Sequence, residues 1–170
     1  QIPGKITGLI TDRDDIKAIE RAVKHDIPFN IIQPSMLGNA QDFASALIHS
    51  LEQFDADVIV LAGYLKKIPD AVIKKYEGRI LNIHPSLLPK YGGKGFYGIK
   101  VHQAVVNHNE QESGCTVHLV TEVYDDGPIL GQSKVSLSEN ETAESLAKKV
   151  LVLEHSLYPK VISDFIKTIS

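Results

Sequence analysis

The run at residues 57–62 constrains the fold most, because five of its six residues are apolar and it contains neither glycine nor proline. Runs this short and this apolar are typical of central strands that are buried on both faces of a parallel sheet. Other strand patterns alternate along the chain with amphipathic, helical ones. We therefore expect an α/β fold in which helices cover both faces of a mostly parallel sheet.

The individual elements follow from the same periodicities. Strands are predicted at residues 5–11, 28–32, 57–62, 80–84, 116–121 and 129–135. Helices are predicted at residues 12–25, 41–54, 69–76, 101–107 and from 142 to the C-terminus. Asp12 is expected to cap the first helix, and Pro159 is expected to kink or break the last one. Residues 34–39 and the glycine-rich residues 90–98 are expected to be loops.

Composition limits the class of protein. A chain of 170 residues with 43% hydrophobic and 23% charged residues is expected to form a single domain over residues 1–170. Its net charge of −3 gives no reason to expect a nucleic acid or an anionic membrane as partner. A single cysteine, Cys115, fits a reducing compartment, so we expect a cytoplasmic protein. No apolar stretch approaches the ~20 residues of a membrane-spanning helix.

An apolar stretch ends in Asn82 and His84, which stand two positions apart and are followed by Pro85. On an extended strand both side chains leave the same face, and the proline stops sheet pairing directly after the histidine. Open α/β sheets bind ligands at the carboxyl ends of their strands. An amide and an imidazole aimed together there are suited to polarising a carbonyl and moving a proton. The alternative is a strand-end pair that backbone groups satisfy.

Asp125 lies in an acidic turn after the predicted strand at residues 116–121. Taken alone, the sequence Asp-Gly-Pro at residues 126–128 is ordinary turn chemistry, and an acidic surface turn is the simpler interpretation. The functional interpretation folds Asp125 back beside His84. A buried carboxylate in that place is expected to raise the histidine pKa and fix the orientation of the ring.

Other polar residues allow two interpretations. The glycines at residues 92–98 either permit a tight path or let backbone N–H groups approach an anion, with Lys90 or Lys94 adding charge. Glu154 belongs either to a site or to a solvated helix face. Cys115 opens an apolar strand and is expected to be buried and inert. His118 is expected to satisfy a hydrogen bond in the core, and no group of residues has the spacing of a zinc site.

The segment NIHPSLLPKY, from Asn82 to Tyr91, resembles the folate-dependent formyltransferases, and the resemblance covers nearly the whole chain. It is strongest to the branch that formylates glycinamide ribonucleotide, through DVIVLAGY at residues 57–64, TVH at 116–118, DDGP at 125–128 and EHSLYP at 154–159. Methionyl-tRNA formyltransferases usually have an Arg-Trp-Arg-Gly type sequence where this chain has KYGG at residues 90–93. Formyltetrahydrofolate deformylases usually have a second histidine at the position of Pro85.

The resemblance implies a Rossmann-like sheet with folate and nucleotide sites at its carboxyl edge. It implies the catalytic triad Asn82, His84 and Asp125, with 10-formyltetrahydrofolate as co-substrate and no metal. Folate-binding residues are expected at Leu65, Lys66, Lys67, Ile68, Asn82, Thr121, Glu122, Val123, Tyr124 and Asp125. Ribonucleotide-binding residues are expected at Gly93, Leu151, Val152, Leu153 and Glu154, with Glu154 accepting the ribose hydroxyls. A monomer or a homodimer is expected.

The implied activity is formyl transfer from 10-formyltetrahydrofolate to the amine of glycinamide ribonucleotide in purine synthesis. The alternatives are hydrolysis of the formylfolate and a non-catalytic folate- or nucleotide-binding module.

Three features depart from the family pattern. The family normally opens with an extra strand and a phosphate-binding glycine-serine-asparagine loop, whereas this sequence begins at what resembles the second strand. We therefore expect an N-terminally truncated domain with weak or no transfer activity. Ala40 stands where the family often has a basic residue, and the loop at residues 92–98 is longer than usual.

Overall fold

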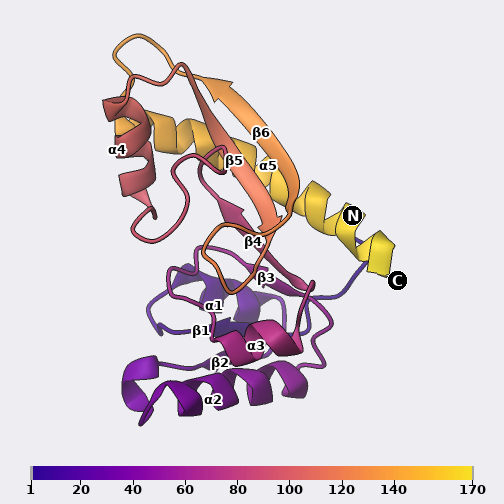
Figure 1. Cartoon of the computed structure of the whole chain (residues 1–170). Helices are drawn as coiled ribbons and strands as arrows, with labels where there is room; N and C mark the ends of the chain where they lie inside the picture. Colours follow the sequence, from indigo (N-terminus) through magenta and orange to yellow (C-terminus); the bar gives the residue numbers. More distant parts are fainter. Residues whose placement is uncertain (1, 170) are drawn as a thin grey trace. The chain divides into compact units, whose positions relative to one another are not determined.

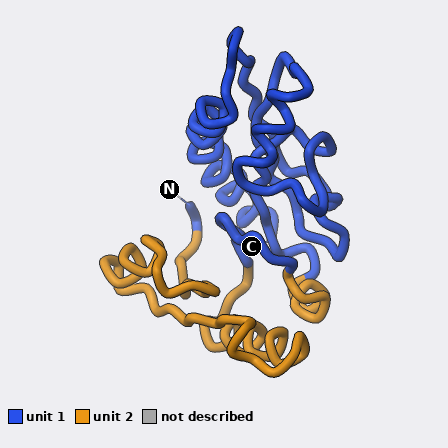
Figure 2. Tube along the Cα trace, turned by 90° about the vertical axis from the view of Figure 1, so that its left-hand side faces the viewer, with its two compact units in different colours: residues 1–3, 59–67, 77–170 blue, residues 4–58, 68–76 orange. Residues whose placement is uncertain are grey.

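The chain forms two compact units, which are described separately below (Figure 2). The computed structural model describes residues 2–169. The larger unit comprises Gln1–Pro3, Ile59–Lys67 and Glu77–Ser170, and the smaller unit comprises Gly4–Val58 and Ile68–Tyr76. A single domain over residues 1–170 stays a prediction.

The larger unit is built on a four-stranded sheet with the order β3-β4-β5-β6 (Figure 1). β3 (Ile59–Leu61) runs parallel to β4 (Ile80–His84), whereas β5 (Glu112–Leu119) and β6 (Ile129–Ser136) continue the sheet as antiparallel strands. The helices of this unit are α4 (Ile99–Asn107) and α5 (Ala143–Ile169). The predicted α/β class is confirmed, and the antiparallel pairs lie in the second half of the chain.

The core of the larger unit joins a strand to both helices. Val105 of α4, Cys115 of β5, and Leu146 and Val150 of α5 form one buried cluster, and none of them is more than 1% exposed. Burial raises the pKa of the Cys115 thiol to about 12, which agrees with the inert cysteine that the sequence predicts. α5 thereby fixes both α4 and the antiparallel ladder.

The smaller unit contains a two-stranded parallel sheet of β1 (Leu9–Thr11) and β2 (Phe29–Ile31). Its helices are α1 (Lys17–Lys24), the 3₁₀ helix η1 (Pro34–Met36), α2 (Ala40–Gln53) and α3 (Asp70–Lys75). The Asn39 side chain caps α2 by accepting hydrogen bonds from the backbone N–H groups of Gln41 and Asp42. The segment predicted as a loop at residues 34–39 thus contains one 3₁₀ turn.

The predicted start of the first helix at Asp12 is wrong. α1 begins at Lys17, with Ile16 as its N-cap. The Thr11 hydroxyl donates to the Arg13 carbonyl (3.0 Å) and accepts from the Arg13 N–H (3.1 Å), while the Arg13 guanidinium binds Asp15. Such local side-chain bonds give the backbone an alternative to the helix, so the helix starts after them.

Two further expectations differ from the structure. β3 is an edge strand of its sheet, with Val60 41% exposed, and not a central strand buried on both faces. α5 continues through Pro159 as one helix, so the expected break is wrong, whereas the alternative expectation of a kink stays a prediction. Tyr158 and Val161, each 8% exposed, flank the proline, and their packing holds the helix on either side of the missing N–H. Among residues 2–169, no helix combines the length and apolar character that membrane crossing requires.

Tyr158 provides a first test of the packing. Its hydroxyl lies 2.9 Å from the carbonyl oxygens of both Leu61 in β3 and Leu81 in β4. Tyr158→Phe leaves these carbonyls without that donor, so we expect a loss of about 1–3 kcal/mol in the free energy of unfolding, measured by urea denaturation. Tyr97→Phe, at a tyrosine 44% exposed, is the control. An equal loss in both variants would contradict the buried bond.

His102 on α4 provides a second test. It is 5% exposed, and its Nδ1 has no hydrogen-bond partner among the described residues. Burial lowers its pKa, and His84 lowers it further. Because the folded pKa lies below the unfolded value of about 6.5, protonation favours the unfolded chain. The contribution of neutral His102 to the free energy of unfolding is therefore complete above about pH 6.5 and is lost as the pH falls through the folded pKa of His102.

Urea titrations at pH 7.5 and pH 5.5 measure this effect. We expect His102→Gln to lose less stability than the parent chain over this interval. The His102→Gln variant still loses some stability over this interval, because burial also lowers the pKa of His84. His25→Gln, at an exposed histidine, is the control. A pH dependence unchanged by His102→Gln would show that His102 does not titrate in this way.

Candidate active site

β4 presents Asn82 and His84 on one face of the sheet. The neighbouring Ile80 and Leu81 are 1% and 0% exposed, so they fix the strand in the core. In the antiparallel ladder with β5, Asn82 lies opposite His118 and His84 lies opposite Thr116. Directly opposed residues in such a ladder share a face. The register therefore adds two polar side chains of β5 to the predicted pair.

His118 contacts Asn82 directly, with 3.1 Å between its Nε2 and the Asn82 Nδ2. Its Nδ1 lies 2.9 Å from the Leu119 carbonyl oxygen and donates to it. In the neutral ring Nε2 therefore carries the lone pair and accepts from the Asn82 amide. His118 is 2% exposed. The hydrogen bond that the sequence predicts for His118 is present, but the sequence analysis misses its place beside Asn82. The two-residue spacing between Thr116 and His118 on the predicted strand is the signal that could have shown that they share a face.

The structure places Asp125 beside His84, as the sequence-based interpretation expects. The Asp125 Oδ2 lies 3.4 Å from the His84 Nδ1, and its Oδ1 lies 3.5 Å from the His118 Nε2. The Gly93 N–H donates to the Asp125 Oδ2 at 2.8 Å. The Asp125 side chain is 12% exposed, and its φ of 54° turns the chain back toward the sheet. Asn82, His84 and Asp125 are thus brought together around His118.

Burial dominates the electrostatics of His84. The ring is 4% exposed, and burial lowers its pKa, although the Asp125 charge and the Tyr91 hydrogen bond act in the opposite direction. Asp125 thus raises the pKa of His84 as expected, but desolvation outweighs the carboxylate and the net shift is downward. The pKa of Asp125 is lowered: burial alone would raise it, but the His118 contact, the His84 charge and the Gly93 N–H together outweigh burial.

The loop at residues 90–98 binds the site through its backbone. The Tyr91 carbonyl accepts from the His84 Nε2 at 2.8 Å, and Gly93 holds Asp125 from the other side. Gly93 has a φ of 89°, a conformation that favours glycine. The Lys90 ammonium is 66% exposed and binds Glu110. That Lys90 or Lys94 adds charge for an anion stays a prediction.

The residues expected to bind folate fall in both units. Leu65, Lys66 and Lys67 follow β3 in the larger unit, whereas Ile68 belongs to the smaller unit. The other expected residues, Thr121, Glu122, Val123 and Tyr124, precede Asp125. Within this turn the Thr121 hydroxyl donates to the Val123 carbonyl at 3.1 Å. Val123 and Tyr124 are 60% and 43% exposed, so apolar surface is open beside the buried carboxylate.

The residues expected to bind the ribonucleotide lie on α5, apart from Gly93. Leu151 and Val152 are exposed, whereas Leu153 packs against the core cluster. Glu154 is partly buried, and burial raises the pKa of its carboxyl group. Partial burial does not fit a fully solvated helix face, and the ribose-binding role of Glu154 stays a prediction.

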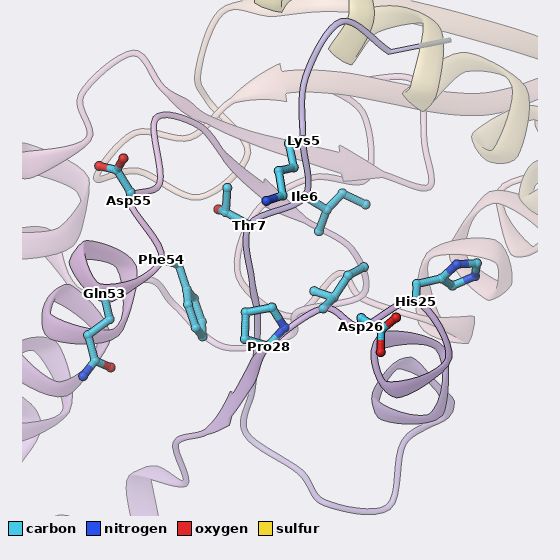
Figure 3. Close-up of a pocket in the computed structure, with 10 residues that line it drawn as sticks. Lys5, Ile6, Thr7, His25, Asp26, Pro28, Gln53, Phe54 and Asp55 are labelled. Atoms are coloured by element: carbon cyan, nitrogen blue, oxygen red, sulfur yellow. The ribbon is translucent and has the colours of Figure 1, made fainter.

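In the part of the chain that the structure describes, neither a metal site nor the pocket of the smaller unit coincides with the expected site residues. Among residues 2–169, no group of three or more His, Cys, Asp or Glu side chains could hold a metal ion. A pocket of about 690 Å³ lies within the smaller unit, and none of the expected site residues lines it (Figure 3). The side chains around it are Lys5, Ile6, Thr7, His25, Asp26, Ile27, Pro28, Gln53, Phe54 and Asp55.

Sequence comparison identifies relatives of the whole chain. The formyl transferase family matches residues 1–162. A chloroplastic phosphoribosylglycinamide formyltransferase of Arabidopsis thaliana is 43% identical over 162 residues, which are 95% of this chain and 56% of that protein. The phosphoribosylglycinamide formyltransferase of Escherichia coli K12 is 33% identical over 165 residues, covering 97% of this chain and 76% of that protein. The chain thus spans about half the length of its plant relatives.

Solved structures agree with the sequence relatives. Phosphoribosylglycinamide formyltransferase from Bacillus halodurans is 33% identical with a TM-score of 0.91, and the match covers 100% of this chain and 85% of that one. Glycinamide ribonucleotide transformylase 1 from Symbiobacterium toebii is 34% identical with a TM-score of 0.90, covering 98% and 76%. The resemblance noted in the sequence is confirmed: this chain belongs to the formyl transferase family and has its Rossmann-like fold.

Proposed function

We propose that this chain transfers a formyl group from 10-formyltetrahydrofolate to the primary amine of glycinamide ribonucleotide, a step of purine synthesis. The observation that carries the proposal is the convergence of an amide, an imidazole and a buried carboxylate on one face of β4 and β5. Relatives named phosphoribosylglycinamide formyltransferase support the choice of substrates.

Asn82 serves in this proposal as a donor to the formyl oxygen. Its Nδ2 carries two hydrogens, and the bond to the His118 Nε2 uses one of them. The second is available to the oxygen that becomes negative when the amine attacks. His118 holds the amide in place, so the donor needs no reorganisation as the charge develops.

His84 and Asp125 handle the proton. The Tyr91 carbonyl holds the His84 Nε2–H, so the proton from the attacking amine goes to Nδ1, which faces Asp125. The new carbon–nitrogen bond forms as the amine loses this proton. The charged imidazole then donates toward the oxyanion and returns the proton to the folate nitrogen as the old carbon–nitrogen bond breaks. Asp125 stabilises the imidazolium throughout.

The substrate contacts are part of the same proposal. Within the larger unit the folate lies against residues 65–67 and 121–125, and the ribonucleotide lies against Gly93 and residues 151–154. Folate binding by Ile68, in the smaller unit, stays a prediction. Leu65, Val123 and Tyr124 are exposed apolar side chains, and the last two directly precede Asp125, which supports an apolar ring system at the first location. We further propose a cytoplasmic location and a monomeric or homodimeric state. The single buried cysteine supports the location.

His84→Ala tests the function. Removing a donor to an oxyanion typically lowers turnover about 100- to 1,000-fold, and we expect at least the lower value in a formyl-transfer assay with both substrates. His49→Ala is the control, because His49 is exposed on α2 and is none of the expected site residues. Turnover by His84→Ala close to that of the parent chain would refute the assignment.

The same reaction mixture separates the alternatives. Formate release without the amine acceptor would identify a hydrolase. Binding of a formylfolate analogue, measured by calorimetry, without transfer in the parent chain would identify a binding module. The sequence-based expectation of weak transfer is tested by the same rates.

A further inference from the structure

Tyr91 has a backbone conformation that a tyrosine rarely adopts. Its φ is 57°, in the left-handed region, where a bulky side chain needs its surroundings to hold it. The carbonyl of this residue is the acceptor for the His84 Nε2–H at 2.8 Å. The strained residue is therefore also the one that orients the imidazole.

The Tyr91 side chain is held from outside the site. Its hydroxyl donates to the Glu110 Oε1 at 2.9 Å. Its ring contacts Phe96 edge-on, with 6.0 Å between centroids, and lies 5.6 Å from the ring of His108. The Glu110 carboxylate is fixed in turn by the Lys90 ammonium, 2.9 and 3.1 Å from its two oxygens. Glu110 thus binds the residues on both sides of the Lys90–Tyr91 peptide bond.

We propose that Glu110 is a positioning residue for His84: through the Tyr91 phenol it holds the Tyr91 carbonyl against the His84 Nε2, and so sets the orientation and proton affinity of the imidazole. The inference rests on the proposed function of His84. Glu110 lies between α4 and β5, and its carboxylate binds Lys90 and Tyr91, not the triad residues.

A surface ion pair alone would not explain this arrangement. Exposed Lys–Glu pairs contribute little to stability, and the chain offers a matched example on β5. Glu112 binds Lys134 at 2.7 Å with both side chains more than half exposed. Glu110 differs because its side chain is only 24% exposed and also accepts from a phenol. The shared phenol is the feature that connects it to the site.

The pKa of His84 depends on several groups that surround its ring. Asp125 raises its pKa, and the hydrogen bond to the Tyr91 carbonyl also raises it. Burial and the His118 charge lower it, and His102 on α4 is coupled to it as well. Loosening the Tyr91 carbonyl while leaving the other groups in place therefore lowers the His84 pKa further.

Nuclear magnetic resonance titration of the His84 ring measures this pKa without any substrate. We expect Glu110→Ala to lower it by about 0.5 pKa unit or more, and Tyr91→Phe to do the same while keeping the Glu110 charge. Glu110→Gln keeps an oxygen acceptor for the phenol and should restore most of the parent value. Glu112→Ala is the control and should leave the His84 pKa unchanged.

Two results would overturn the proposal. In the first, Glu110→Gln lowers the His84 pKa as far as Glu110→Ala does, whereas Tyr91→Phe leaves that pKa unchanged. Glu110 would then act only through its charge. If Glu110→Ala leaves the His84 pKa unchanged, Glu110 has no positioning role. Tyr91→Phe removes a single hydroxyl, so it keeps the test open if Glu110→Ala fails to fold.

Transfer kinetics separate this proposal from the proposed function. We expect Glu110→Ala to lower kcat about 3-fold or more, the equivalent of 0.5 pKa unit, with KM for the formyl donor unchanged. If the parent chain has no transfer activity but Glu110→Ala still lowers the His84 pKa, the positioning role holds and the proposed function is refuted. If the parent chain is active but Glu110→Ala leaves the His84 pKa unchanged, the proposed function holds and the positioning role is refuted.

Discussion

The site depends on the burial of the Asp125 carboxylate and on the groups that surround it. A buried charge is costly unless it is paired and hydrogen-bonded, and this one is only 12% exposed. The groups nearest to it come from three segments: the Gly93 N–H, which donates to it, and the rings of His84 on β4 and His118 on β5. Because no single segment satisfies Asp125, the turn, the strand pair and the glycine-rich loop must fold together for the carboxylate to stay buried.

The strand register makes this convergence possible. Asn82 and His118 are direct partners in the antiparallel β4–β5 pair, as are His84 and Thr116. A slip of one residue would turn every side chain of one strand to the opposite face. Leu81 and Val117, both 0% exposed, resist such a slip because it would bring them to the polar face. The apolar residues of these strands therefore specify the site as well as the core.

Sequence reasoning found the parts of the site that side-chain types reveal. A polar pair at a strand end identified Asn82 and His84, but Asp125 alone resembles an ordinary acidic turn and needed the family resemblance. His118 was assigned to the core because its cross-strand partner depends on register. The contributions of Tyr91 and Gly93 are backbone groups, which no side-chain pattern shows. Similarly, periodicity located most helices, but it could not show that bonds between Thr11 and Arg13 delay the start of α1.

The burial of His84 bears on how such a site favours reaction over binding. A group that was charged beforehand would attract the formyl oxygen in the ground state as well as in the transition state. Burial lowers the pKa of the ring, so the neutral imidazole faces an ionised Asp125 before the amine arrives. In the proposed reaction the imidazole takes up the proton of the amine, and a new cation then forms near a carboxylate and the developing oxyanion, where little water would screen either interaction. The strongest attraction then arises only as the reaction proceeds.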